Sequence, residues 1–151
     1  LEKMNFCLKK GLSVVQGDAN YDLNDFSDNS FSTVILSQTI QATIFPERVI
    51  KNLIRIGKRA IISFPNFGFW KVRKDFFFSG KMPKNKILSY EWFDTPNIHL
   101  CSVNDFIQLC RKNRIKINEK VLLNEDGKKL WSKSFLENLL TYQVIFCVSK
   151  K

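Results

Sequence analysis

The sequence predicts an α/β fold with a mostly parallel sheet that ends in antiparallel strands at its C-terminal end. Residues 33–37 and 60–64 are apolar at consecutive positions, which is typical of parallel strands covered on both faces. Between these runs, residues 49–54 carry apolar side chains at helical spacing, and Pro46 and Gly57 mark the start and end of that helix. A strand, a helix and a strand of these lengths predict a βαβ unit.

The segment before this unit predicts a helix, a strand and a turn. Residues 1–10 carry apolar side chains on one helical face, and Gly11 is the expected stop. Residues 12–16 are short and apolar, which predicts a strand. The sequence Gly-Asp-Ala-Asn at residues 17–20 then predicts a turn, because these residue types favour turn geometry.

The segment after the predicted βαβ unit is more aromatic and less regular. Residues 67–80 predict a helix, whereas residues 82–100 predict an irregular excursion. Ser102 is the expected start of the next helix, because Asp105 follows three residues later in an arrangement like a capping box.

Two strands are expected near the C-terminus. Residues 115–123 alternate mostly between apolar and polar side chains, which predicts a strand with one wetter face. Residues 142–148 predict the last strand, after a polar loop and the segment 131–140. Because no clear crossover joins these two strands, we expect them to pair antiparallel. Residues 1–151 show no repeat or flexible linker and predict part of one domain.

The composition indicates a globular protein, with 44% hydrophobic and 25% charged residues. No apolar run approaches the roughly 20 residues that a membrane-spanning helix needs. The net charge of +10 raises the question of nucleic-acid binding. However, 18 of the 24 basic residues are lysines spread along the chain, which favours a solvated surface. A basic nucleic-acid-binding protein is therefore the least favoured alternative.

The cysteines predict free thiols and no metal site. Cys7, Cys101, Cys110 and Cys147 form no C-x-x-C pair, and His99 is the only histidine that could complete a zinc site. Each cysteine lies among apolar neighbours, so we expect buried thiols in a reducing, cytoplasmic compartment.

Several motifs resemble one family. The stretches are residues 37–42, residues 64–70 (F-P-N-F-G-F-W), residues 80–83 and residues 92–101 (W-F-D-T-P-N-I-H-L-C). Together they resemble the MetW family of methionine biosynthesis proteins, within the class I S-adenosylmethionine-dependent methyltransferases. The resemblance covers about residues 11–117 and is specific, since this combination of strings is hard to meet by chance.

The resemblance implies a Rossmann-like fold and an N-terminally truncated domain. The family's first two strands and its glycine-rich cofactor loop have no counterpart in the chain, and no G-x-G-x-x-G is present. We therefore expect residues 1–151 to be the later part of one methyltransferase-like domain. The family's sheet would place the missing strands between residues 12–16 and 33–37, so these two segments are not expected to pair. The fragment alone is expected to bind S-adenosylmethionine weakly or not at all.

The resemblance also implies cofactor contacts. Asp18 would accept a hydrogen bond from the adenine amino group, and the backbone N–H of Ala19 would face a ring nitrogen. Ser37 and Gln38 would flank the methionine portion of the cofactor. The alternatives are a turn aspartate that satisfies its own loop and ordinary loop polarity. This assignment requires the segment ends at residues 16, 37 and 64 to converge on one crevice.

Asn66, Phe67, Trp70 and Asn97 are the candidate substrate-binding residues. The Asn66 amide could orient a substrate, and the two aromatic side chains could line an apolar pocket. Alternatively, Phe67 and Trp70 form a helix face that packs on the sheet.

His99 is a weak candidate for a general base, because it is the only imidazole in the chain. A structural or partner-facing role is the alternative. Arg73, with Lys71 and Lys74 nearby, could bind an anion or could simply be solvated on a helix. The sequence shows no paired acids or activated nucleophile.

The resemblance implies a role in methionine biosynthesis, with two alternatives left open. The protein could be a methyltransferase that uses S-adenosylmethionine, in which case catalysis would rest mainly on positioning the reactants. It could instead be a non-catalytic partner or activator of homoserine O-acyltransferase.

Overall fold

The computed structural model describes residues 2–86, 88–132 and 134–151. Its elements in chain order are α1 (Glu2–Lys9), η1 (Asp22–Asp25), β1 (Val34–Ser37), η2 (Ile40–Ala42), α2 (Pro46–Ile56), β2 (Ala60–Pro65), α3 (Trp70–Ser79), α4 (Val103–Lys112), β3 (Ile115–Leu123), α5 (Ser134–Leu140) and β4 (Gln143–Lys150). None of the helices in these described ranges is both long and apolar enough to cross a membrane.

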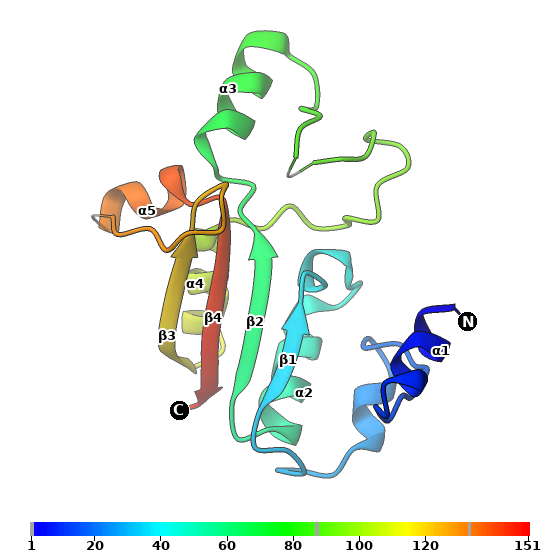
Figure 1. Cartoon of the computed structure of the whole chain (residues 1–151). Coiled ribbons are helices and arrows are strands. Elements are labelled where there is room, and N and C mark those ends of the chain that lie inside the picture. Colours follow the sequence, from blue (N-terminus) through cyan, green and yellow to red (C-terminus); the bar gives the residue numbers. More distant parts are fainter. Residues whose placement is uncertain (1, 87, 133) are drawn as a thin grey trace.

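The four strands form one mixed sheet in the order β1-β2-β4-β3. β1 and β2 are parallel and are joined through α2, which confirms the predicted βαβ unit. β4 is antiparallel to both β2 and β3, so it alone runs against the other three strands. This arrangement confirms the predicted α/β sheet with an antiparallel C-terminal end (Figure 1).

The strand predicted for residues 12–16 is wrong. This segment has no regular secondary structure, and the side chains of Leu12 and Val15 are 56% and 81% exposed. A strand needs a hydrogen-bonded neighbour, and no described strand pairs with this segment. As expected, it does not pair with β1, whose partner in the sheet is β2.

β1 is less covered than its apolar sequence predicts. Leu36 is buried in the core, but Ile35 is 66% exposed on the opposite face of the strand. β1 lies at the edge of the sheet in Figure 1, with α2 on one face. The run of consecutive apolar residues therefore does not mean that both faces of this strand are covered.

The core lies between the sheet and the helices α2 and α4. Phe64 from β2, Phe106 from α4 and Phe146 from β4 are almost fully buried, and the ring centroids of Phe106 and Phe146 are 4.6 Å apart. α4 begins at the predicted capping box, in which the Ser102 side chain accepts from the Asp105 backbone N–H and the Asp105 carboxylate accepts from the Ser102 N–H. Both helices contribute side chains to the same hydrophobic cluster.

The thiols are free, but only one of them is fully buried. Cys110 is buried, whereas Cys7, Cys101 and Cys147 are half-buried. Burial raises the pKa of the Cys101 thiol to about 12, with a further contribution from the Asp105 carboxylate. Burial also raises the pKa of the Cys110 thiol to about 11, so both thiols are protonated at neutral pH.

α3 extends away from the carboxyl end of the sheet (Figure 1). It starts at Trp70, later than the predicted residue 67, and it ends at Ser79, where Gly80 caps it in the left-handed conformation with φ of 61°. Phe77 and Phe78 near its end are 82% and 77% exposed, and their ring centroids lie 5.2 Å apart. The described residues of the segment 82–100 that follows are irregular, as predicted.

Candidate functional site at the carboxyl edge of the sheet

A cavity of about 490 Å³ lies at the carboxyl ends of β1 and β2, and we call it the edge cavity. Gln38 and Gln41 line it from the segment after β1, and Pro65 lines it from the end of β2. Asn97 from the irregular segment and Tyr142 before β4 close other sides. In open α/β sheets, ligands bind in the crevice outside the carboxyl ends of the strands, so this is the expected place for a site.

Gln38 has a strained backbone at the mouth of the edge cavity. Its φ is 52°, in the left-handed region that residues with a Cβ rarely adopt. The backbone N–H of Gln38 donates to the Ser63 carbonyl oxygen at 2.9 Å, which fixes the turn against β2. Strained residues of this kind gather at ligand sites, so the conformation supports a binding role for this turn.

Gln38→Gly is expected to be about 1 kcal/mol more stable than Gln38→Ala, because glycine adopts the left-handed conformation without the Cβ clash. Urea unfolding of both variants measures this difference. Gln108 on α4 is the matched control, since there the glycine variant should be the less stable one by about 0.5–1 kcal/mol. Equal stability of the two Gln38 variants would show that the backbone strain is absent.

Gln41 supplies an unpaired acceptor beside the edge cavity. Its side chain is 6% exposed, its Nε2 donates to the Gln38 carbonyl oxygen at 3.0 Å, and its Oε1 has no partner among the described residues. A buried acceptor without a partner costs about 1–3 kcal/mol. A ligand with an N–H donor would recover that cost, so Gln41 points to a ligand at this cavity.

The backbone of Gln41 also holds the irregular segment in place. Its carbonyl oxygen accepts from the N–H groups of Ile98 and His99, at 2.8 and 2.9 Å. This pair of bonds brings Asn97 to the edge cavity. Tyr142 faces the same cavity, and burial, followed by the Glu125 carboxylate, raises the pKa of its hydroxyl. At neutral pH this hydroxyl therefore remains a hydrogen-bond donor.

The turn at residues 17–20, which contains Asp18, does not line the edge cavity. It is hydrogen-bonded to the chain that follows η2. Asp18 is exposed, and its Oδ1 accepts from the backbone N–H and the side-chain amide of Asn20, both at 2.8 Å. The Asn20 Oδ1 in turn accepts from the N–H groups of Ile44 and Phe45, which follow η2. Asn20 therefore ties the Asp18 turn, with half-buried Ala19, to the chain that leaves the edge cavity.

The imidazole of His99 lies outside the lining of the edge cavity. The ring is exposed, and its Nε2 lies 3.4 Å from the Ile44 carbonyl oxygen. No carboxylate among the described residues is hydrogen-bonded to it, so it lacks the orienting partner that general bases commonly have. Nor does the described part of the chain contain a group of three or more side chains suited to a metal ion.

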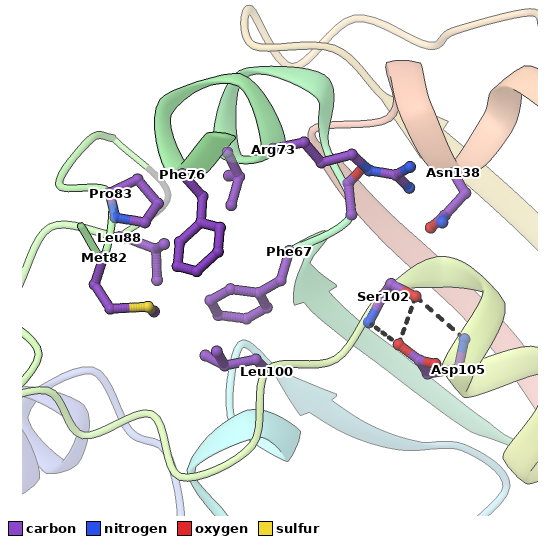
Figure 2. Close-up of a pocket in the computed structure, with 12 residues that line it drawn as sticks. Phe67, Arg73, Phe76, Met82, Pro83, Leu88, Leu100, Ser102, Asp105 and Asn138 are labelled. Carbon is purple, nitrogen blue, oxygen red and sulfur yellow. Dashed lines mark hydrogen bonds between the residues drawn. The ribbon is translucent and has the colours of Figure 1, made fainter. Parts of the chain in front are cut away.

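Asn66, Phe67 and Trp70, the predicted residues that follow β2, lie in three different environments. Asn66 is fully buried, and its amide is hydrogen-bonded within the protein through both its nitrogen and its oxygen. Phe67 lines a second, apolar cavity (Figure 2). Trp70 is exposed beside Lys71 and lines neither cavity. The Asn66 amide thus acts as a structural link, and Phe67 is the aromatic residue that faces a cavity.

The expected convergence of three segment ends on one crevice holds for two of them and is wrong for the third, at residue 16. Ser37 and Phe64 lie at the ends of neighbouring parallel strands, and the residues that follow them, Gln38 and Pro65, both line the edge cavity. Gln16 belongs to the exposed segment 12–16 and does not reach this cavity. Sequence reasoning missed Gln41 and Tyr142, although Gln41 follows Gln38 at the i+3 spacing that puts side chains on one side of a helical turn.

A family model and a curated relative both match this chain, and both name the same family. The family model described as "Methionine biosynthesis protein MetW" matches residues 1–148. The bifunctional methionine biosynthesis protein MetXA/MetW of Rhodopirellula baltica is 32% identical over 118 residues, which is 78% of this chain. The match covers 19% of that protein, so the chain spans about a fifth of the length of this curated relative.

Solved structures show the same fold at low sequence identity. A S-adenosylmethionine-dependent methyltransferase of Thermotoga maritima, described as a possible histamine N-methyltransferase, has a TM-score of 0.66 and 20% identity, with 99% of this chain and 70% of that chain covered. A putative S-adenosylmethionine-dependent methyltransferase of Listeria monocytogenes has a TM-score of 0.64 and 13% identity, with 100% and 77% covered. These similarities establish the class of fold.

Proposed function

Because the chain belongs to the MetW family of methionine biosynthesis proteins, we propose that its edge cavity receives the methionine end of S-adenosylmethionine. The proposal combines a family, a methyltransferase fold and a cavity at the carboxyl edge of the sheet. It assigns the protein a role in methionine biosynthesis that depends on cofactor binding.

The unpaired Oε1 of Gln41 carries this proposal. The methionine end of the cofactor has an ammonium group, which donates the hydrogen bond that this buried acceptor lacks. Ser37 and Gln38 at the end of β1 would flank the same portion, as the family resemblance implies. The residues present at the edge cavity therefore fit this part of the cofactor.

Three other predicted residues, Asp18, Ala19 and Asn97, would contribute to the same site. Asp18 and Ala19 would hold the adenine, and their turn is tied by Asn20 to the chain that leaves the edge cavity. Asn97 lines the edge cavity and would face the substrate. The cofactor supplies a methyl group on a positively charged sulfur, and the protein contributes mainly by positioning the two reactants and excluding water.

Gln41→Met is expected to weaken S-adenosylmethionine binding about tenfold, since a hydrogen bond to a charged group contributes about 1.5–3 kcal/mol. Stability should stay within about 1 kcal/mol of the parent or rise, because the change removes one hydrogen bond and one unpaired acceptor together. Protein NMR titration, which also detects weak binding, and urea unfolding measure the two quantities.

Gln108→Met, on the exposed side of α4, is the matched control and should change neither quantity. Unchanged cofactor affinity in Gln41→Met would contradict the proposed site. A loss of several kcal/mol of stability would instead identify Gln41 as a structural residue.

A second proposed role is complex formation with homoserine O-acyltransferase, with or without methyl transfer. The relative from Rhodopirellula baltica is named as one bifunctional protein with MetXA and MetW parts, which supports physical association of the two. The exposed Phe77 and Phe78 on α3 offer an aromatic surface next to the basic residues Lys74 and Lys81. Such a surface suits a partner with an apolar patch and an acidic rim.

A further inference from the structure

A second cavity, of about 460 Å³, lies between α3, the start of α4 and α5, and we call it the apolar cavity. Its volume falls within the roughly 300–1,000 Å³ that small-molecule sites occupy. Figure 2 shows that apolar side chains gather on one side of it and polar side chains on the other. The apolar side includes Phe67, Val72, Phe76, Met82, Leu88 and Leu100.

The polar side contains the guanidinium group of Arg73, and only part of its hydrogen-bonding capacity is taken up within the protein. The Nε of Arg73 donates to the Gly68 carbonyl oxygen at 2.6 Å, which fixes the side chain along α3. No carboxylate in the described part of the chain forms an ion pair with Arg73. In Figure 2 the guanidinium is directed toward Asn138, at the polar end of the cavity. Within the described part of the chain its one hydrogen bond uses Nε, which leaves the N–H groups of Nη1 and Nη2 for an anion.

Asn138 places an unpaired acceptor at the same end. Its Oδ1 is buried and has no hydrogen-bond partner among the described residues. The amide packs directly against the Gly68 backbone, since a Cβ added at Gly68 would lie 2.7 Å from this Oδ1. Such an acceptor suits a ligand with an N–H donor.

Asp105 adds a negative charge at the same polar end of the cavity. One carboxylate oxygen, Oδ2, accepts from the backbone N–H and the hydroxyl of Ser102, at 3.0 and 2.6 Å. The carboxylate thus stays fixed at the edge of the cavity, as Figure 2 shows. The polar end therefore offers one cation together with a carboxylate and an amide oxygen, opposite an apolar wall.

We propose that the apolar cavity binds an α-amino acid with an apolar side chain. Its carboxylate would pair with Arg73, its ammonium group would donate to Asn138 and Asp105, and its side chain would lie against Phe67 and Phe76. An α-amino acid carries these two opposite charges on one carbon, next to an apolar chain. The proposal concerns a different cavity from the cofactor proposal and does not depend on it.

Titration of the protein with L-methionine, L-leucine and L-phenylalanine tests this site, with binding followed by isothermal titration and by protein NMR. Two analogues of leucine separate the two charges: 4-methylvalerate lacks the ammonium group, and isoamylamine lacks the carboxylate. We expect saturable binding of the amino acids and at least tenfold weaker binding of both analogues. No saturation by any of the three amino acids at about 10 mM, or binding of 4-methylvalerate as tight as that of leucine, would overturn the proposal.

Substitutions test whether the amino acid binds in the apolar cavity. Arg73→Gln and Phe76→Ala are expected to weaken amino-acid binding about tenfold, because they remove the anion partner and part of the apolar wall. Arg111→Gln on α4 and Phe135→Ala on α5 are matched controls, since both residues are exposed and neither lines the cavity. Amino-acid affinity that falls equally in the controls, or that is unchanged in both cavity variants, would contradict this location. Unfolding curves of each variant show whether the fold is retained.

Discussion

Asn66→Ala is expected to lower the free energy of unfolding by about 3–5 kcal/mol, because it removes a buried amide that joins several parts of the fold. The Asn66 Nδ2 donates to the carbonyl oxygens of Asn138 and Thr141, at 2.9 and 2.7 Å. Its Oδ1 accepts from the backbone N–H groups of Gly68 and Val103, at 3.0 and 3.2 Å. The variant leaves four backbone groups without this partner, so the expected loss is large beside the 5–15 kcal/mol of a typical domain.

Urea unfolding of Asn66→Ala measures this loss. Asn104→Ala is the matched control, because Asn104 is exposed on α4 and the change should stay within about 0.5 kcal/mol. A loss below about 1 kcal/mol for Asn66→Ala would contradict the structural role. That result would instead favour the expected role of the Asn66 amide in contacting a substrate.

The double change Phe77→Glu and Phe78→Glu is expected to weaken the complex with homoserine O-acyltransferase at least about 100-fold. Both rings are exposed in the free protein, so their replacement should leave its stability within about 0.5 kcal/mol. Two carboxylates in an apolar contact would lose the buried aromatic area and would themselves be desolvated on binding. The loss should therefore appear in the affinity of the complex.

Co-purification and surface plasmon resonance with the acyltransferase of the same organism measure this effect. Trp131→Glu is the matched control, because Trp131 is 83% exposed and lies outside α3. Unchanged affinity of the double variant would show that α3 is not the contact surface. Absence of any complex with the parent chain would remove the proposed partner.

Local signals in the sequence predict much of the fold. The βαβ unit, the capping box at Ser102 and the antiparallel β3–β4 pair all follow from periodicity or from residues close in sequence. The wrong strand at residues 12–16 has an apolar sequence of the right length. Its failure depends on the absence of a pairing neighbour, which an apolar run does not encode.

The candidate site is only partly readable from the sequence. Gln38 can be placed because parallel strands end at one edge of a sheet, and it does line the edge cavity. The role of Asn66 depends on carbonyl groups 72 and 75 residues away, which no local pattern reveals. The unpaired oxygens of Gln41 and Asn138 likewise appear only when burial and partners are known.

The central claim is that the edge cavity receives the methionine end of S-adenosylmethionine. A protein NMR titration with S-adenosylmethionine, carried to millimolar concentration, tests it most directly, since the method also detects weak binding. We expect saturable shifts of the side-chain amides of Gln38, Gln41 and Asn97, with the Gln108 amide unchanged. The claim would be contradicted if these three amides stayed unshifted while the cofactor bound elsewhere, or if no signal moved at all.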